Sequence, residues 1–151
     1  MGAKSSQRRS VHFYFEGVRP TLENRKRLKD FVSTLANREK RDLNTLNYIF
    51  CRDKDLLQIN RKYLHHDFYT DVITFDLSSS SKEILADIYI SVDRVKDNAT
   101  ALGFSFKEEL HRVMVHGLLH LCGYNDKSAG QRKVMRKKEG FYLDLYFTRF
   151  T

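Results

Sequence analysis

Two histidines and an aspartate within one short segment have the types and the spacing of metal ligands. His116 and His120 lie four residues apart, so on a helix they project about 40° from one another and can reach one ion. Gly123 accepts the left-handed conformation that ends helices, and a reversal of the chain there brings Asp126 back toward the histidines. Three protein ligands leave a fourth position open for water, as in catalytic rather than structural zinc sites. The segment therefore predicts a hydrolytic site with one Zn²⁺ ion.

A purely structural interpretation of the same residues is also open. The two histidines could be ordinary core or surface residues of a helix, with Gly123 as its cap. The aspartate three residues beyond the glycine favours the metal site over this interpretation. Cys122 projects from the other side of the helix, and we expect it to be a small buried residue rather than a ligand.

The carboxylate ligand has a consequence for the charge of the site. Zn²⁺ with two neutral imidazoles and one carboxylate carries one positive charge, whereas three imidazoles would leave two. We therefore expect water bound to this ion to be less acidic, and the attraction for a phosphate to be weaker, than in a three-histidine site.

Composition sets limits on the class of protein. The 151 residues suffice for a single domain with one core, and the 41% hydrophobic content is ordinary for a globular protein. Lys and Arg outnumber Asp and Glu by 27 to 19, which gives a formal net charge of +8. This excess favours polyanionic partners, either nucleic acid or an anionic membrane surface, although a merely basic protein is also possible.

Few features of the chain point to a membrane or to secretion. Only two cysteines are present, the N-terminus has no apolar signal segment, and no apolar run reaches the length of a membrane span. Met1-Gly2 with Ser6 satisfies the short myristoylation pattern, which nothing else in the sequence supports. We therefore expect a reduced, cytoplasmic location without a membrane.

Hydrophobic periodicity predicts alternating strands and helices. Apolar residues at every second position predict strands over residues 10–16, 44–51, 71–77 and 84–90, the last two forming a hairpin. Helical spacing predicts a first helix from Thr21, then helices over 53–63, 91–102, from 105 through the histidines, and from 128 towards 150. Asp53, Ser91 and Ser105 are the expected caps. The order predicts an α+β fold over residues 1–151, in which a small mixed sheet of about four strands packs with about five helices.

The ligand spacing also occurs in metzincin proteases, which raises peptide hydrolysis as a possible function. Those enzymes carry a glutamate directly after the first histidine, and this glutamate is the general base. Gly117 occupies that position here, so a protease would lack its base.

The longer string from His116 to Asp126 (HGLLHLCGYND) resembles the signature of the YbeY family, bacterial endoribonucleases specific for single strands. Residues 59–63 (INRKY) and 70–75 (TDVITF) resemble the family segments Leu-Asn-x-x-Tyr-Arg and Thr-Asp-Val-Leu-Ser-Phe. Ala86-Asp87-Ile88 stands where the family has Gly-Asp-Ile, and Met135 with Glu139 fits its C-terminal helix. The resemblance covers about residues 45 to 140 in matching order.

The resemblance implies a zinc-dependent endoribonuclease that acts in ribosomal RNA 3′-end maturation and ribosome quality control. It implies single-stranded RNA, ribosomal RNA and the small ribosomal subunit as partners. Two alternatives remain open: a non-catalytic, ribosome-associated RNA-binding module with a structural zinc, and, less favoured, a metallopeptidase. The sequence identifies no general base, and either water on the metal or the ribose 2′-hydroxyl could be the nucleophile.

Two positions depart from the family pattern. The usual third histidine ligand is Asp126, and the usual arginine after the tyrosine is Leu64, which cannot contact a phosphate. Arg61, one helical turn earlier, and Arg132 are the candidate substrate contacts that could replace it. Basic residues crowd the segment that follows Asp126, where they could attract a phosphate backbone or form only a solvated face: Lys127, Arg132, Lys133, Arg136, Lys137 and Lys138.

Other polar residues carry weaker expectations. Asp87 interrupts an apolar strand and could hold a ligand histidine through its second ring nitrogen, or simply belong to an exposed face. Asp71 could cap a strand or line the site. His65 and His66 lie in an expected loop and are disfavoured as acid–base residues, and His111 is expected to be structural.

Overall fold

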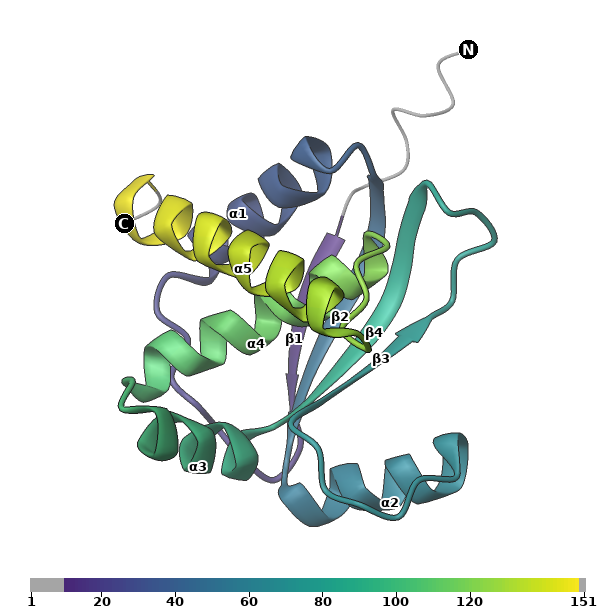
Figure 1. Cartoon of the computed structure of the whole chain (residues 1–151), viewed down its shortest axis with the longest axis vertical. Helices are drawn as coiled ribbons and strands as arrows, with labels where there is room; N and C mark the ends of the chain where they lie inside the picture. Colours follow the sequence, from purple (N-terminus) through teal and green to yellow (C-terminus); the bar gives the residue numbers. More distant parts are fainter. Residues whose placement is uncertain (1–9, 150–151) are drawn as a thin grey trace.

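The computed structural model describes residues 10–149, so the Met1-Gly2 and Ser6 pattern lies outside the described residues. Nine elements follow one another along the chain (Figure 1): β1 (Ser10–Phe15), α1 (Arg25–Arg38), β2 (Asp42–Cys51), α2 (Asp53–Leu64), β3 (Val72–Asp76), β4 (Glu83–Ser91), α3 (Val92–Leu102), α4 (Phe106–Leu121) and α5 (Ala129–Arg149). The predicted α+β fold, with four strands and five helices, is confirmed.

The four strands form one mixed sheet in the order β1-β2-β4-β3. β1 and β2 are parallel, β2 and β4 are parallel, and β3 pairs antiparallel with β4, which confirms the predicted hairpin. Tyr48 in the middle of β2 stands between Phe13 of β1 and Ile88 of β4. The hairpin places β3 at one edge of the sheet (Figure 1).

The two faces of the sheet are covered unequally because alternate residues of each strand point to opposite faces. The large core lies between one face and the helices α1, α3, α4 and α5. A small second core lies on the other face, under α2, and consists of Cys51, Leu56 and Ile73. Residues 10–149 contain no helix with the length and apolar character that a membrane crossing requires.

α4 is the central helix, and it lies close against the sheet. Ser105 caps its N-terminus, as the sequence predicts, and it also forms a capping box with Glu108. The Tyr48 hydroxyl donates a hydrogen bond to the Met114 carbonyl at 3.1 Å. A side chain at Gly117 would place its Cβ only 3.1 Å from Cγ2 of Ile88, so the glycine allows the helix to approach β4 this closely. This contact sets the height above the sheet of the part of α4 that carries His116 and His120.

Two predicted helix starts were wrong. Asp53 is not the cap of α2, because the N-cap is Arg52 and has no side-chain cap bond. The Asp53 carboxylate instead accepts hydrogen bonds from Arg94 Nη2 at 2.7 Å and from the Ser91 hydroxyl at 3.1 Å, and so links α2 to α3. The first helix begins at Arg25 rather than Thr21, since Asn24 adopts a left-handed conformation with φ 49° and its side chain caps the helix.

Candidate metal centre

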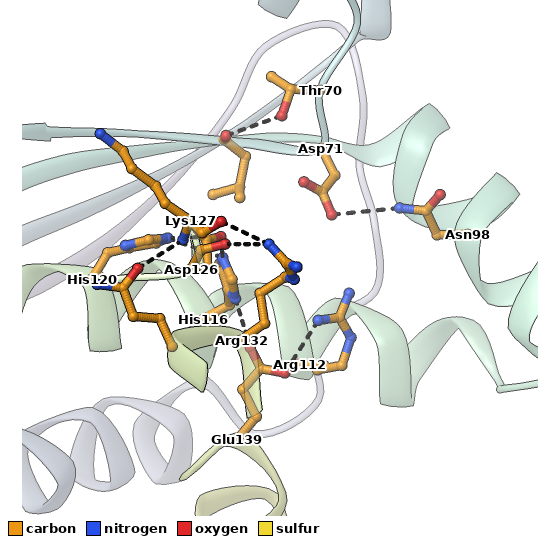
Figure 2. A network of polar contacts seen from close by, with 12 residues as sticks. Thr70, Asp71, Asn98, Arg112, His116, His120, Asp126, Lys127, Arg132 and Glu139 are labelled. Carbon is orange, nitrogen blue, oxygen red and sulfur yellow. Dashed lines mark hydrogen bonds and ion pairs between the residues drawn. The ribbon is translucent and has the colours of Figure 1, made fainter. Parts of the chain in front are cut away.

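His116, His120 and Asp126 lie together at the C-terminal end of α4 (Figure 2). The histidines occupy the last two turns of α4, and Asp126 belongs to the loop that leads to α5. Nε2 of His116 is 3.1 Å from Nε2 of His120, and Asp126 Oδ2 lies 3.3 Å from the first nitrogen and 3.4 Å from the second. Three potential ligand atoms from two segments therefore form a nearly equilateral triangle.

The size of this triangle fits tetrahedral zinc. With bonds of about 2.0–2.1 Å to nitrogen and oxygen, two ligand atoms of a tetrahedral Zn²⁺ are separated by roughly 3.3–3.4 Å. The three observed separations are within a few tenths of an ångström of this value. Two imidazoles and a carboxylate are also a donor set that zinc accepts. The three residues can thus hold one ion together without rearrangement.

The reversal at Gly123 is what brings Asp126 to the histidines. Gly123 has φ +101°, and its N–H donates a hydrogen bond to the His120 carbonyl at 3.0 Å. Arg41, which directly precedes β2, holds the same turn by donating from Nη2 to the Cys122 carbonyl at 2.6 Å. Cys122 itself is buried, and burial raises the pKa of its thiol to about 12. A thiol that stays protonated and buried agrees with the expectation that Cys122 is not a ligand.

The loop that carries Asp126 is also attached to α1 and α5 through Glu39. The Tyr124 hydroxyl donates to Glu39 Oε1 at 2.8 Å, and Tyr142 and Lys138 of α5 contact the other carboxylate oxygen. Burial alone would raise the pKa of Glu39, but the hydrogen bonds from Tyr142 and Tyr124 outweigh it and lower the pKa. An ionised Glu39 therefore holds the loop two residues before Asp126.

Glu139 of α5 contacts His116 at Nδ1, the ring nitrogen that does not belong to the triangle. Glu139 Oε2 lies 2.5 Å from His116 Nδ1, and the carboxylate is only 3% exposed. Burial lowers the pKa of His116, but the hydrogen bond and charge of Glu139, with the charge of Asp126, raise it overall. The sequence suggested Asp87 for this role, and that suggestion was wrong. Asp87 points to the opposite face of the sheet, where it accepts a hydrogen bond from Asn47 Nδ2 at 3.0 Å.

Arg112 extends this contact into a charged network within the core. Its Nη1 donates to Glu139 Oε1 at 3.3 Å, and its Nε donates to the fully buried Glu109 at 2.8 Å. Nη2 donates to the second oxygen of Glu109 at 2.5 Å. Each of the three guanidinium nitrogens thus contacts a carboxylate, so Arg112 supports Glu139 from the side away from His116 Nδ1.

Asp71 lies on the strand side of the cluster (Figure 2), consistent with the expectation that it lines the site. It precedes β3, and its Oδ2 accepts a hydrogen bond from Asn98 Nδ2 at 3.4 Å. Burial raises the pKa of its carboxyl group, against the opposing charges of Arg112 and His116.

The two arginines expected to contact substrate have different surroundings. Arg132 lies beside the ligand loop, where its Nη1 donates to the Lys127 carbonyl at 2.8 Å and approaches the Asp126 carbonyl at 3.5 Å (Figure 2). Arg61 is exposed at the end of α2 and forms an ion pair with Asp67. Leu64 is 38% exposed in the last turn of the same helix.

The remaining histidines lie outside the ligand triangle. His65 ends α2 in a left-handed conformation, and His66 stacks on Phe68 with ring centroids 5.1 Å apart. His111 is buried, stacks on Tyr146, and its Nδ1 lies 2.7 Å from the Lys107 carbonyl. The surroundings of His111 are those expected of a structural residue.

Comparisons with known proteins agree with the resemblance. The family model described as endoribonuclease YbeY matches residues 16–146. The chain is 48% identical over 136 residues to the endoribonuclease YbeY of Cytophaga hutchinsonii, an alignment that covers 90% of this chain and 95% of the relative. It is 43% identical over 134 residues to that of Amoebophilus asiaticus, with 89% and 91% covered.

A solved structure has the same fold. The solution structure of TM1509 from Thermotoga maritima superposes with a TM-score of 0.59 at 26% sequence identity, over 89% of this chain and 87% of that one. Its overall similarity agrees with the family match, which extends from the end of β1 into α5 and includes all three residues of the triangle. The chain belongs to the endoribonuclease YbeY family.

Proposed function

We propose that the chain is a metal-dependent endoribonuclease that hydrolyses phosphodiester bonds in single-stranded RNA. The ion is Zn²⁺, held by His116, His120 and Asp126, and the process served is ribosomal RNA 3′-end maturation and ribosome quality control in the cytoplasm, on the small ribosomal subunit. The observation that carries the proposal is the triangle of ligand atoms with sides of 3.1 to 3.4 Å, in a chain of this family.

The protein side chains around the triangle supply orientation and charge. A bound Zn²⁺ would polarise a phosphoryl oxygen or lower the pKa of the nucleophile. Glu139 fixes the ring of His116, so that Nε2 faces the other ligands. Within residues 10–149, the guanidinium of Arg132 forms hydrogen bonds through Nη1 alone. Its Nε and Nη2 are therefore available to a phosphate oxygen beside Asp126. The surrounding basic residues attract the backbone of the strand.

The position of Gly117 argues against a metallopeptidase. The general base of metzincin proteases follows the first histidine, and here that position packs against Ile88 and Thr74 of the sheet. A Cβ would already be 3.1 Å from Ile88, so this site offers no room for a catalytic side chain.

The proposal is tested by metal analysis combined with cleavage assays. We expect about one zinc per chain, cleavage of single-stranded RNA with little cleavage of duplex RNA, and loss of cleavage in His120→Ala. His66→Ala removes an exposed histidine outside the triangle and should cleave as wild type does. Equal cleavage by wild type and His120→Ala would identify a contaminating nuclease and contradict the proposal.

The same variants separate a catalytic metal from a structural one. If the metal is catalytic, His120→Ala or chelation removes cleavage while circular dichroism and the unfolding transition keep most of the native signal. Unfolding of the domain on chelation, without any cleavage by the metal-loaded wild type, would instead support the RNA-binding module with a structural zinc.

A further inference from the structure

A groove runs along one side of α5 and begins at the metal-binding loop. Its first part has a volume of about 450 Å³ and is lined by loop residues that include Tyr124 and Asn125. Its second part, of about 540 Å³, lies between α5 and the end of α1. Val134 lines both parts, so they adjoin. Asn125 directly precedes Asp126, which places the start of the groove beside the proposed cleavage site.

The lining of the groove alternates exposed apolar and cationic side chains. Val134 and Phe141 are each 49% exposed. The guanidinium of Arg38 lies 5.2 Å from the centroid of the Phe141 ring, and Lys138 Nζ lies 5.5 Å from that of Tyr124. Aromatic rings that stack on bases, with cations that pair with the backbone, are the means by which proteins hold single-stranded nucleic acid.

The charge of the groove is positive despite the carboxylate in its lining. Glu39 is already engaged by Tyr124, Tyr142 and Lys138. Within residues 10–149, neither Arg38 nor Lys137 forms an ion pair, so both present uncompensated charge to an occupant. A polyanion complements this surface, whereas a second copy of a chain with net charge +8 would be repelled.

We propose that this groove holds the single-stranded segment of the RNA that adjoins the scissile phosphate. The inference rests on the proposed function and adds the path of the strand: from the metal centre over Asn125, past Val134, to a base stacked on Phe141 between Arg38 and Lys137. The bases in the groove contribute to the affinity for RNA and take no part in the cleavage step.

Binding and cleavage, measured separately, test the proposal. Fluorescence anisotropy of the metal-loaded protein with a labelled, 2′-O-methylated oligonucleotide of roughly 12 nucleotides, within the ~4–16 nucleotide site sizes of such grooves, gives the affinity. Phe141→Ala should weaken binding about 5- to 150-fold through the lost stacking. Lys137→Gln should lower the slope of log Kd against log salt by about 0.7. In cleavage assays both variants should raise KM and leave kcat near the wild-type value.

Matched variants control for general loss of an aromatic ring or a charge. Phe104→Ala removes a ring that is also 49% exposed but lies outside the groove, and Lys26→Gln removes an exposed charge at the far end of α1. Both should bind RNA as wild type does.

Three results would overturn the groove proposal. One is unchanged RNA binding in both groove variants. Another is binding of polyglutamate as tight as that of RNA, which would indicate an acidic protein partner. The third is a change of oligomeric state in Phe141→Ala, which would indicate a second copy. Failure of the proposed function has a different signature, because wild type would then bind RNA without cleaving it.

Discussion

Nδ1 of His116 lies 2.5 Å from the buried carboxylate of Glu139, across the interface between α4 and α5. When Nδ1 carries the ring proton and donates a hydrogen bond to this carboxylate, Nε2 keeps its lone pair. That lone pair faces His120 and Asp126. Packing of the last helix on the central helix therefore fixes the tautomer and orientation of a proposed metal ligand.

Replacement of Glu139 by glutamine should weaken metal binding while preserving the volume of the core. We expect Glu139→Gln to lower zinc affinity about 10- to 100-fold, because the neutral amide makes the imidazole less basic and no longer dictates its tautomer. Competition with a chromophoric chelator measures the affinity. Asp144→Asn, an exposed change on the same helix, should bind zinc as wild type does. Equal affinities in Glu139→Gln and wild type would show that the contact has no part in metal binding.

The raised pKa of His116 predicts a pH dependence of the metal-free protein. The pKa lies above the ordinary value of 6.5 in the folded state, since Glu139 and Asp126 outweigh the effect of burial. A group with a raised folded pKa stabilises the fold fully below its unfolded pKa, and this stabilisation is lost as the pH rises through the folded pKa. The free energy of unfolding of the metal-free protein should therefore fall as the pH rises from about 6.5 through the folded pKa of His116.

The titration of His111 changes the stability in a different pH range from that of His116, so the two contributions to the free energy of unfolding can be separated. Burial lowers the pKa of His111 below 6.5, so its contribution to stability is lost as the pH falls from 6.5 through that lowered value. Urea unfolding of the metal-free wild type and Glu139→Gln at several pH values gives both slopes. The decline above pH 6.5 should be reduced in Glu139→Gln, and the decline below 6.5 should remain. If the dependence of stability on pH above 6.5 were the same in Glu139→Gln and wild type, the assigned interaction of His116 with Glu139 would be contradicted.

Two of the glycines within helices, Gly117 of α4 and Gly140 of α5, should respond to alanine with opposite signs. In α4, a Cβ at Gly117 would lie 3.1 Å from Ile88 Cγ2 and 3.2 Å from its Cδ1, and Ile88 is fully buried. We expect Gly117→Ala to destabilise the protein by about 1 kcal/mol or more, because overpacking outweighs the gain in helix propensity. Nothing lies within 4 Å of a Cβ at Gly140, so Gly140→Ala should stabilise by up to about 1 kcal/mol. Denaturant unfolding measures the change in the free energy of unfolding for both variants. A stabilising Gly117→Ala would show that Ile88 of β4 shifts at little cost to make room for the methyl group.

The sequence predicted those parts of the fold and site that depend on local spacing. His116 and His120 lie on one face because four residues span about one helical turn. Gly123 reverses the chain because a positive φ suits glycine. The hairpin of β3 and β4 likewise follows from two neighbouring strands joined by a short polar segment. Each of these inferences needs only residues that are close in the chain.

Contacts between distant segments could not be predicted in this way. Glu139 is 23 residues from His116, and the two meet only because α5 packs back on α4. From the sequence, Asp87 could hold a histidine or belong to an exposed strand face, and the alternation of side chains along β4 turns it to the other face of the sheet. A clue was present in Glu139 itself, since its position beside Met135 on the apolar side of a helix implies a buried charge that needs partners.

The aspartate in the triangle should set the pH range of RNA cleavage. A Zn²⁺ ion held by two imidazoles and Asp126 would carry one positive charge less than in a three-histidine site, so it would lower the pKa of the nucleophile less strongly. Asp126→His should therefore move the acidic limb of the pH–kcat profile to lower pH. Asp97→His makes the same change of residue at an exposed position of α3, and its profile should coincide with that of wild type. Zinc content must be equal in all three proteins, because a variant that loses its ion would change amplitude rather than shape. A wild-type profile no more alkaline than that of Asp126→His would mean that the charge of the third ligand does not control the titrating group.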